Sequence, residues 1–168
     1  WLNFIDNRGI KVWAEIQVSK KIIKDVLHTS ADKIFNVWLG KNIFGSIMSG
    51  SLGFNAHFAN VIASIFIATG QDVAHVVEGS LGVTTAKLLK DGDLYFSIYL
   101  PSLMVGTIGG GTKLPAQQAA FSILGLKGEN KTIQLAEIIG SAVLAGELSL
   151  LAALAENKLA QAHKTLGR

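Results

Sequence analysis

The sequence has no cysteine among its 168 residues. That absence excludes a disulfide framework and thiolate metal sites, and it is consistent with a reducing compartment, so we expect a cytoplasmic location. Histidine is scarce as well: the four residues are His28, His57, His75 and His163, and no H-E-x-x-H motif or comparable cluster surrounds them. A metal site is therefore not expected.

Long runs of one charge are also missing. The 15 basic and 12 acidic residues give a net charge of +3, and the longest basic run is the lysine pair Lys20 and Lys21. No aromatic residues alternate with a basic run, so nucleic acid is not an expected partner. The mild positive balance suits an anionic small molecule, such as a phosphorylated cofactor.

Apolar residues, in contrast, are plentiful. They make up 49% of the chain against 16% charged residues, which predicts one folded domain with a substantial core. Because the sequence starts at Trp1 rather than at Met, we expect a piece of a longer protein.

Residues 138–154 approach the length of a membrane-spanning helix. Glu147 lies in their middle, and an isolated carboxylate at the centre of a bilayer is costly, so we predict a buried pair of helices instead. The competing hypothesis is a non-enzymatic helical membrane or assembly module that rests on residues 132–155. Detergent-dependent solubility of the full-length protein would favour that hypothesis.

The spacing of apolar residues predicts an α+β (mixed α/β) fold. Residues 10–18 alternate between apolar and polar positions, as in a half-buried strand. Ser19 and Ser30 can each cap a short helix, one ending near residue 28 and the other near residue 40. Residues 55–78 are apolar on every side, which predicts a central helix buried all round.

The second half of the chain predicts a hairpin followed by helices. Residues 82–100 form the expected β-hairpin, with Gly92 in its tight turn. Pro101 should end the second strand, and Pro115 should open a further helix. Residues 131–163 are then helical, with breaks expected near their internal glycines.

Asp72 is the first candidate for chemistry, because it stands at the end of the apolar segment 55–78. If that helix is buried all round, the carboxylate either meets a cation or has its pKa raised by desolvation, and both outcomes suit a catalytic carboxylate. Lys41 is one candidate cation. It lies beside the glycine-rich residues 45–53, whose small side chains indicate backbone packed close to a neighbour or a ligand.

The glycine-rich segment GTIGGGT, residues 106–112, is the second candidate. It fails the G-x-G-x-x-G fingerprint because Ile108 occupies the place of the second glycine, and it fails the phosphate-loop pattern because Lys113 does not directly follow a glycine. Three consecutive glycines can expose backbone N–H groups to a flat or phosphorylated ligand, or they can form a tight structural loop. The residues alone leave both interpretations open.

Two further polar positions have two interpretations each. His57 and Asn60 would share a helix face, where a polar pair can simply satisfy backbone groups. His163 lies in the polar tail, where it is either solvated or, if the tail folds over a site, a general acid with a near-neutral pKa.

Three segments in series resemble the catalytic region of the 3-hydroxy-3-methylglutaryl-coenzyme A (HMG-CoA) reductase family, in its class I soluble archaeal type. The similarity covers nearly the whole chain in the family's order. It implies that residues 1–168 are part of the large catalytic domain, with the N-terminal part and the small cofactor-binding domain absent. The segments are KNIFGSIMSGSLGFNAHFANVIASIFIATGQD (41–72), GTIGGGTKLPAQQAAFSILG (106–125) and LAGELSLLAALAENKLAQAH (144–163).

The resemblance also implies a set of site residues. Asp72 matches the catalytic aspartate, His163 the histidine that protonates the coenzyme A thiolate, and Lys41 a catalytic and substrate-contacting lysine. His75 is taken as structural. The other implied positions contact the HMG portion (Asn60), form an apolar wall of the substrate pocket (Leu150, Ala153, Leu154) or bind the cofactor near the nicotinamide (Gln71, Ile108, Gly109, Gly110, Gly111, Thr112).

The activity that the resemblance implies is the reduction of HMG-CoA to mevalonate and coenzyme A with two NADPH and no metal, in the pathway to isoprenoids. The family works as a homodimer or higher oligomer with active sites between subunits, and no membrane contact is expected for this part. The family's D-K-K-P lysine, its catalytic glutamate and its D-A-M-G-M-N cofactor motif are not among these residues. We therefore expect the chain alone to be inactive.

Overall fold

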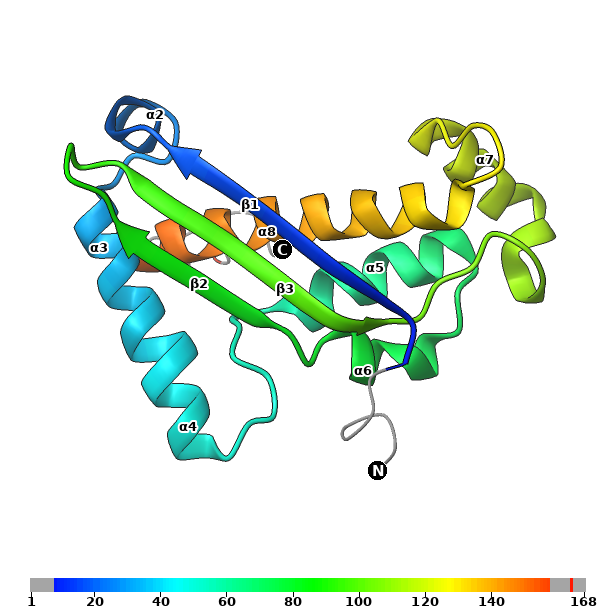
Figure 1. Cartoon of the computed structure of the whole chain (residues 1–168), viewed down its shortest axis with the longest axis horizontal. Coiled ribbons are helices and arrows are strands. Elements are labelled where there is room, and N and C mark those ends of the chain that lie inside the picture. Colours follow the sequence, from blue (N-terminus) through cyan, green and yellow to red (C-terminus); the bar gives the residue numbers. More distant parts are fainter. Residues whose placement is uncertain (1–7, 158–163, 165–168) are drawn as a thin grey trace. The chain divides into compact units, whose positions relative to one another are not determined.

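The structure, a computed structural model, describes residues 8–157 and residue 164. A three-stranded sheet has the order β1-β3-β2, and β3 runs antiparallel to both neighbours (Figure 1). Sheet and helices together confirm the predicted α+β class. In chain order the elements are β1 (Ile10–Val18), α2 (Lys20–Asp25), α3 (Ala31–Val37), η1 (Trp38–Gly45), α4 (Ser46–Ser49), α5 (Phe58–Thr69), η2 (Val73–His75), α6 (Val76–Gly79), β2 (Val83–Leu88), β3 (Leu94–Leu103), η3 (Gly110–Lys113), α7 (Pro115–Leu124) and α8 (Lys131–Ala155).

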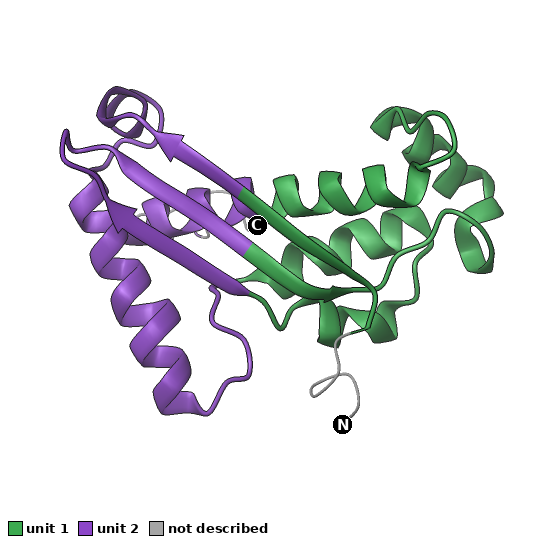
Figure 2. Cartoon of the chain, in the orientation of Figure 1, with its two compact units in different colours: residues 1–14, 57–82, 99–143 green, residues 15–56, 83–98, 144–168 purple. Residues whose placement is uncertain are grey.

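The chain divides into two compact units, each assembled from segments far apart in the sequence (Figure 2). Unit 1 comprises residues 1–14, 57–82 and 99–143. Unit 2 comprises residues 15–56, 83–98 and 144–168. The buried apolar side chains of unit 1 are Val12, Phe58, Ile62, Phe66, Leu100, Leu103, Leu135, Ala136, Ile139 and Val143. The core of unit 2 is formed by Val18, Ile23, Ala31, Ile34, Ala86, Leu94, Phe96, Leu151 and Ala152.

The helices of unit 2 begin where the sequence predicts. The Ser19 hydroxyl accepts a hydrogen bond from the backbone N–H of Ile22, and Ser30 does the same for Lys33. The first helix ends earlier than predicted, at Asp25. The second continues further than predicted, because α3 runs directly into the π-helix η1 and then into α4.

Two glycines of residues 45–53 have different surroundings in unit 2: a Cβ added at Gly45 would lie 3.3 Å from the Gly40 carbonyl oxygen. Gly45 ends η1 and is itself helical. Gly50 ends α4 with φ +67°, and a Cβ added there would meet nothing within 4 Å. The prediction of tight packing is therefore wrong at Gly50, where the need for glycine comes from the left-handed backbone that closes the helix.

The central helix of unit 1 is shorter and more exposed than predicted. Only one face of α5 is buried, through Phe58, Ile62, Phe66 and Thr69. The helix stops at Thr69 because Gly70 adopts φ +69° and the N–H of the next residue bonds back to the Phe66 carbonyl at 2.9 Å. Two short helices, η2 and α6, follow this turn, so the prediction of one helix over residues 55–78, buried all round, is wrong.

The predicted β-hairpin is confirmed, with β2 and β3 joined by a turn in which Gly92 has φ +80°. Pro101 does not end the second strand, because β3 continues to Leu103. β2 has six residues and β3 has ten, so the end of β3 extends past β2. A proline lacks the N–H that a partner strand would need, and it is tolerated where that partner has ended.

Pro115 opens α7 as predicted, but the next helix differs from the prediction. Residues 131–155 form the single helix α8 rather than a pair of helices. Gly140 does not break α8: a Cβ there would lie 2.5 Å from Cγ1 of Val12, so the glycine permits close packing on β1 within unit 1. By length and composition alone, α8 could cross a membrane, and about a third of its most apolar window (33%) is buried.

Glu147, near the middle of α8, is fully buried in unit 2. Its Oε1 accepts hydrogen bonds from Asn42 Nδ2 at 3.0 Å, from the Ala56 N–H at 2.5 Å and from Thr84 Oγ1 at 2.7 Å. These donors come from η1, from the segment before α5 and from β2. The carboxylate therefore joins three segments of unit 2 at one atom, as a buried acceptor must if its desolvation is to be offset.

Candidate functional site

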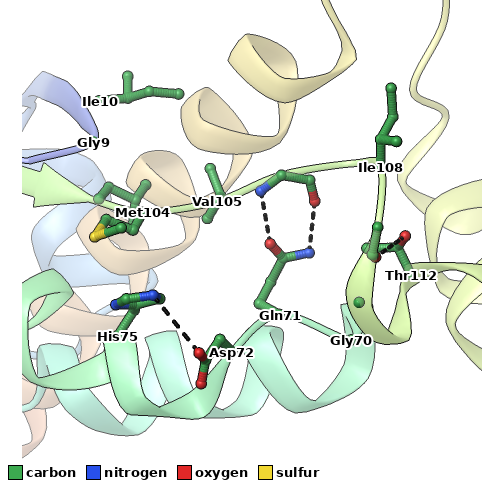
Figure 3. Close-up of a pocket in the computed structure, with 14 residues that line it drawn as sticks. Gly9, Ile10, Gly70, Gln71, Asp72, His75, Met104, Val105, Ile108 and Thr112 are labelled. Atoms are coloured by element: carbon green, nitrogen blue, oxygen red, sulfur yellow. Dashed lines mark hydrogen bonds and ion pairs between the residues drawn. The ribbon is translucent and has the colours of Figure 1, made fainter.

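A cavity of about 340 Å³ lies in unit 1, between the turn that follows α5 and the loop that follows β3 (Figure 3). Asp72 and His75 are the titratable side chains among its described lining residues, and much of the remaining lining is backbone or apolar. The full lining is Gly9, Ile10, Gly70, Gln71, Asp72, His75, Leu103, Met104, Val105, Gly106, Ile108, Gly109, Gly110 and Thr112.

Gly70 and Gly111 bring the two sides of this cavity together. A Cβ added at Gly70 would lie 2.6 Å from the carbonyl carbon of Gly111 and 2.7 Å from its oxygen. No side chain fits at such distances, so the turn after α5 meets the glycine loop through bare backbone. Gly70 and Gly111 thus make a close backbone approach in unit 1, at a different place from residues 45–53, for which the sequence predicted one.

Gln71 connects the same two segments through its side-chain amide. Its Nε2 donates to the Gly106 carbonyl at 2.9 Å, and its Oε1 accepts from the Gly106 N–H at 2.8 Å. Figure 3 shows the amide facing this backbone, with both bonds dashed. The sequence places Gln71 in the site, but nothing in its local pattern reveals a partner 35 positions away.

Asp72 is not the buried carboxylate that the sequence predicts. Because α5 ends at Thr69, Asp72 lies on the following turn, and its side chain is 65% exposed. Its Oδ1 accepts a hydrogen bond from the Ala74 N–H at 2.9 Å, which caps η2. The prediction that burial would desolvate this carboxylate is therefore wrong. Asp72 lines the cavity, so it is still a candidate for contact with a ligand.

His75 lies closer to the candidate chemistry than the sequence indicates. Its Nε2 is 3.7 Å from Oδ2 of Asp72, and its Nδ1 is 3.8 Å from Oε1 of Glu78. Figure 3 shows the ring turned toward the aspartate in the cavity. The signal that could have identified it is the spacing D-x-x-H-x-x-E, which places three titratable groups on one helical face.

The glycine loop combines an exposed wall with an anchored end. Gly109 and Gly110 have φ values of +89° and +53°, a backbone that strongly favours glycine, and Ile108 is 89% exposed. Thr112 is buried, and its hydroxyl donates to the Gly109 carbonyl at 2.6 Å. The backbone of residues 108–111 can therefore meet a flat ligand while Thr112 holds the loop in place.

The remaining predicted residues lie outside the described lining of this cavity. Asn60 is exposed in the first turn of α5 in unit 1, and Lys41 is exposed on η1 in unit 2. Leu150, Ala153 and Leu154 are half-buried on α8 in unit 2. His163 is outside the described residues. Among the described residues of unit 1, the cavity thus brings Asp72 together with Gln71 and the glycine loop, and Asn60 lies outside its lining.

Within residues 8–157 and residue 164, no group of three or more histidine, aspartate or glutamate side chains has the arrangement to hold a metal ion.

Comparisons with known proteins match the whole chain. The family described as hydroxymethylglutaryl-coenzyme A reductase matches residues 1–168. A 3-hydroxy-3-methylglutaryl-coenzyme A reductase from Methanocaldococcus jannaschii is 51% identical over 167 residues, covering 99% of this chain and 41% of that protein. The corresponding reductase from Pyrococcus horikoshii is 51% identical over 172 residues, covering 99% of this chain and 42% of that protein.

Reductase 2 from Dictyostelium discoideum is 44% identical over 170 residues, covering 96% of this chain and 32% of that protein. The chain therefore spans well under half the length of these relatives. Together with the match over all 168 residues, these similarities establish that the chain belongs to the hydroxymethylglutaryl-coenzyme A reductase family.

Proposed function

We propose that this chain supplies part of the active site of a reductase that converts HMG-CoA to mevalonate and coenzyme A with two NADPH. The observation that carries the proposal is the cavity in unit 1, whose lining contains Asp72, with its carboxylate directed toward His75, together with glycines of the loop after β3. Because glycine carries no side chain, a flat ring can approach the backbone of this loop closely. Family membership supports the reaction type.

Bound NADPH would supply hydride to the carbonyl carbon in each of the two reductions. Each hydride addition places negative charge on the carbonyl oxygen, so a cation or an acid must stand beside that oxygen. Lys41 is the proposed cation from this chain, and the family's second lysine is not among these residues. The carboxylate of Asp72, exposed and held by the Ala74 N–H, would orient the family's second lysine.

Loss of the coenzyme A thiolate between the two reductions needs a proton donor of near-neutral pKa. His163 is proposed for that role. The aldehyde oxygen formed in this step must also be protonated after the second hydride addition. Asn60 is proposed to contact the HMG portion, and Leu150, Ala153 and Leu154 to form an apolar wall of the substrate pocket.

The proposed cofactor contacts are Gln71 and the loop residues Ile108, Gly109, Gly110, Gly111 and Thr112. We propose NADPH rather than NADH, and a homodimer or higher oligomer whose active sites lie between subunits. The family's catalytic glutamate and D-K-K-P lysine are not in this sequence. The chain would therefore carry only part of the catalytic set.

The test compares the chain alone with a completed enzyme, in which the chain follows the preceding residues of the Methanocaldococcus jannaschii relative. The purified 168-residue chain is expected to show no HMG-CoA-dependent oxidation of NADPH. The completed enzyme is expected to show it. Turnover by the chain alone would contradict the proposal that it carries only part of the catalytic residues. A folded but inactive completed enzyme would contradict the proposed function.

A further inference from the structure

We propose that Gln71 is also a positioning residue: its amide holds the glycine loop at a fixed distance from Asp72, and only Oε1 keeps a lone pair for the proposed cofactor contact. The role of this spacing in reduction rests on the proposed function. The positioning itself rests on geometry within unit 1.

Most of the hydrogen-bonding capacity of the Gln71 amide is already used within the protein. A glutamine amide has two N–H donors and one carbonyl oxygen. Nε2 donates to the carbonyls of Gly106 at 2.9 Å and Thr69 at 3.2 Å, and Oε1 accepts from the Gly106 N–H at 2.8 Å. Both donors are therefore committed to the protein backbone. A cofactor amide could reach only the remaining lone pair of Oε1.

Two attachments join the loop to residues 70 and 71, one toward each end, and Thr107 Oγ1 also lies 3.2 Å from Thr132 Oγ1 on α8. Gly106, where the loop begins, pairs with Gln71, and Gly111 packs against Gly70 so closely that no Cβ fits between them. The two residues that hold the loop, Gly70 and Gln71, are consecutive, and Asp72 follows them directly. The backbone that carries the carboxylate is thus the same backbone that holds the loop.

A glycine-rich loop needs such attachments more than other loops do. Glycine has the largest backbone freedom in the unfolded or unattached state, so holding residues 106–111 in one conformation is entropically costly. Paired hydrogen bonds from one planar amide restrict both position and orientation. Without them, the wall of the cavity would move relative to Asp72.

The chain contains a matched control in the same unit. Gln134 on α8 makes the same pair of bonds with the backbone of Lys127: its Nε2 donates to the carbonyl at 2.7 Å, and its Oε1 accepts from the N–H at 3.1 Å. Neither residue is among the described lining of the cavity. Gln134→Met therefore removes an equivalent pair of bonds without touching the glycine loop.

The experiment measures amide hydrogen exchange by NMR in the 168-residue chain and three variants. In Gln71→Met, the Gly106 amide is expected to exchange about five- to tenfold faster, as loss of one net hydrogen bond predicts, and the amides of residues 107–111 should also speed up. Gln71→Glu keeps an acceptor for the Gly106 N–H, so protection of that amide should be partly restored. Gln134→Met should accelerate exchange at Lys127 and leave the loop unchanged.

The inference is overturned if Gln71→Met leaves exchange of residues 106–111 as slow as Gln134→Met does, or if Gln71→Glu restores nothing at Gly106. In the completed enzyme, Gln71→Met should raise KM for NADPH several-fold and leave KM for HMG-CoA unchanged. Gln134→Met should not raise KM for NADPH. An unchanged KM for NADPH would overturn the link to the cofactor. Because exchange is measured without substrate, an inactive completed enzyme would contradict the proposed function and leave the exchange result decisive for the positioning role.

Discussion

Asp72 in unit 1 and Glu147 in unit 2 carry the same functional group in opposite surroundings. The Asp72 side chain is 65% exposed and accepts one local backbone hydrogen bond at the start of η2. Glu147 is fully buried and accepts bonds from three segments of its unit. A carboxylate that is saturated by the protein stabilises the fold, whereas one that keeps its oxygens toward a cavity can serve a ligand.

The two units also use glycine differently. Gly50 in unit 2 and Gly70 in unit 1 both end a helix with nearly the same φ, +67° and +69°. Open space surrounds Gly50, whereas Gly70 touches the backbone of Gly111. The same local signal therefore marks only a helix end in unit 2, but a helix end and a cavity wall in unit 1.

The largest effect on stability is expected for Glu147→Ala. The substitution leaves the buried donors of Asn42 and Thr84 without their acceptor, and each such group costs about 1–3 kcal/mol, so the free energy of unfolding should fall by about 3 kcal/mol or more. Asp72→Ala removes one exposed cap and should cost about 1 kcal/mol or less. Urea denaturation of both variants checks the difference, and equal losses would contradict the contrast between the carboxylates.

An intermediate effect is expected for alanine at the two helix-ending glycines. Gly50→Ala introduces only the left-handed backbone cost, about 1–2 kcal/mol. Gly70→Ala adds a collision with Gly111 and should therefore cost more, while also disturbing the glycine loop. Thermal denaturation of the two variants measures the first difference, and loop amide exchange measures the second. If Gly50→Ala is the more damaging change, the close approach at Gly70 does not matter energetically.

The smallest effect is expected at Asp93 in unit 2, and it depends on pH. Hydrogen bonds from the Lys20 N–H, and secondarily from the Gln17 amide, hold the pKa of this carboxyl below its ordinary value of 3.8. Because the folded-state pKa is depressed, its contribution to stability is present above pH 3.8 and is lost as the pH falls through the folded-state value.

Asp93→Asn should therefore reduce stability at neutral pH and flatten its decline in acid. Urea midpoints of the wild-type chain and the variant, taken across the acid range, check this expectation. Parallel curves for the two proteins would show that Asp93 does not contribute to the acid sensitivity.

Local patterns in the sequence predict much of the fold. The serine caps of α2 and α3, the alternation of β1, the turn at Gly92 and the proline that opens α7 all depend on neighbours within a few residues. The single helix α8 could not be predicted in the same way. Gly140 looks like a break in the sequence, but it serves packing against Val12, which is distant along the chain.

The candidate site, like the fold, has features that the sequence predicts and features that it does not. A carboxylate after an apolar helix and a run of glycines are visible in the sequence, and the family resemblance links them. Their meeting through the Gly70 and Gly111 backbones and through the Gln71 amide depends on contacts across more than 30 positions, which no local pattern encodes. The exposure of Asp72 was missed because the helix was predicted to continue past Gly70.

The most direct test of the account is the kcat of the completed enzyme with Asp72→Asn. Asparagine can keep the bond to the Ala74 N–H, so thermal stability should not change, whereas loss of the charge should lower kcat for HMG-CoA-dependent NADPH oxidation about 100-fold or more. Folded Asp72→Asn enzyme with wild-type turnover would contradict the claim that the cavity in unit 1 is the reductase site.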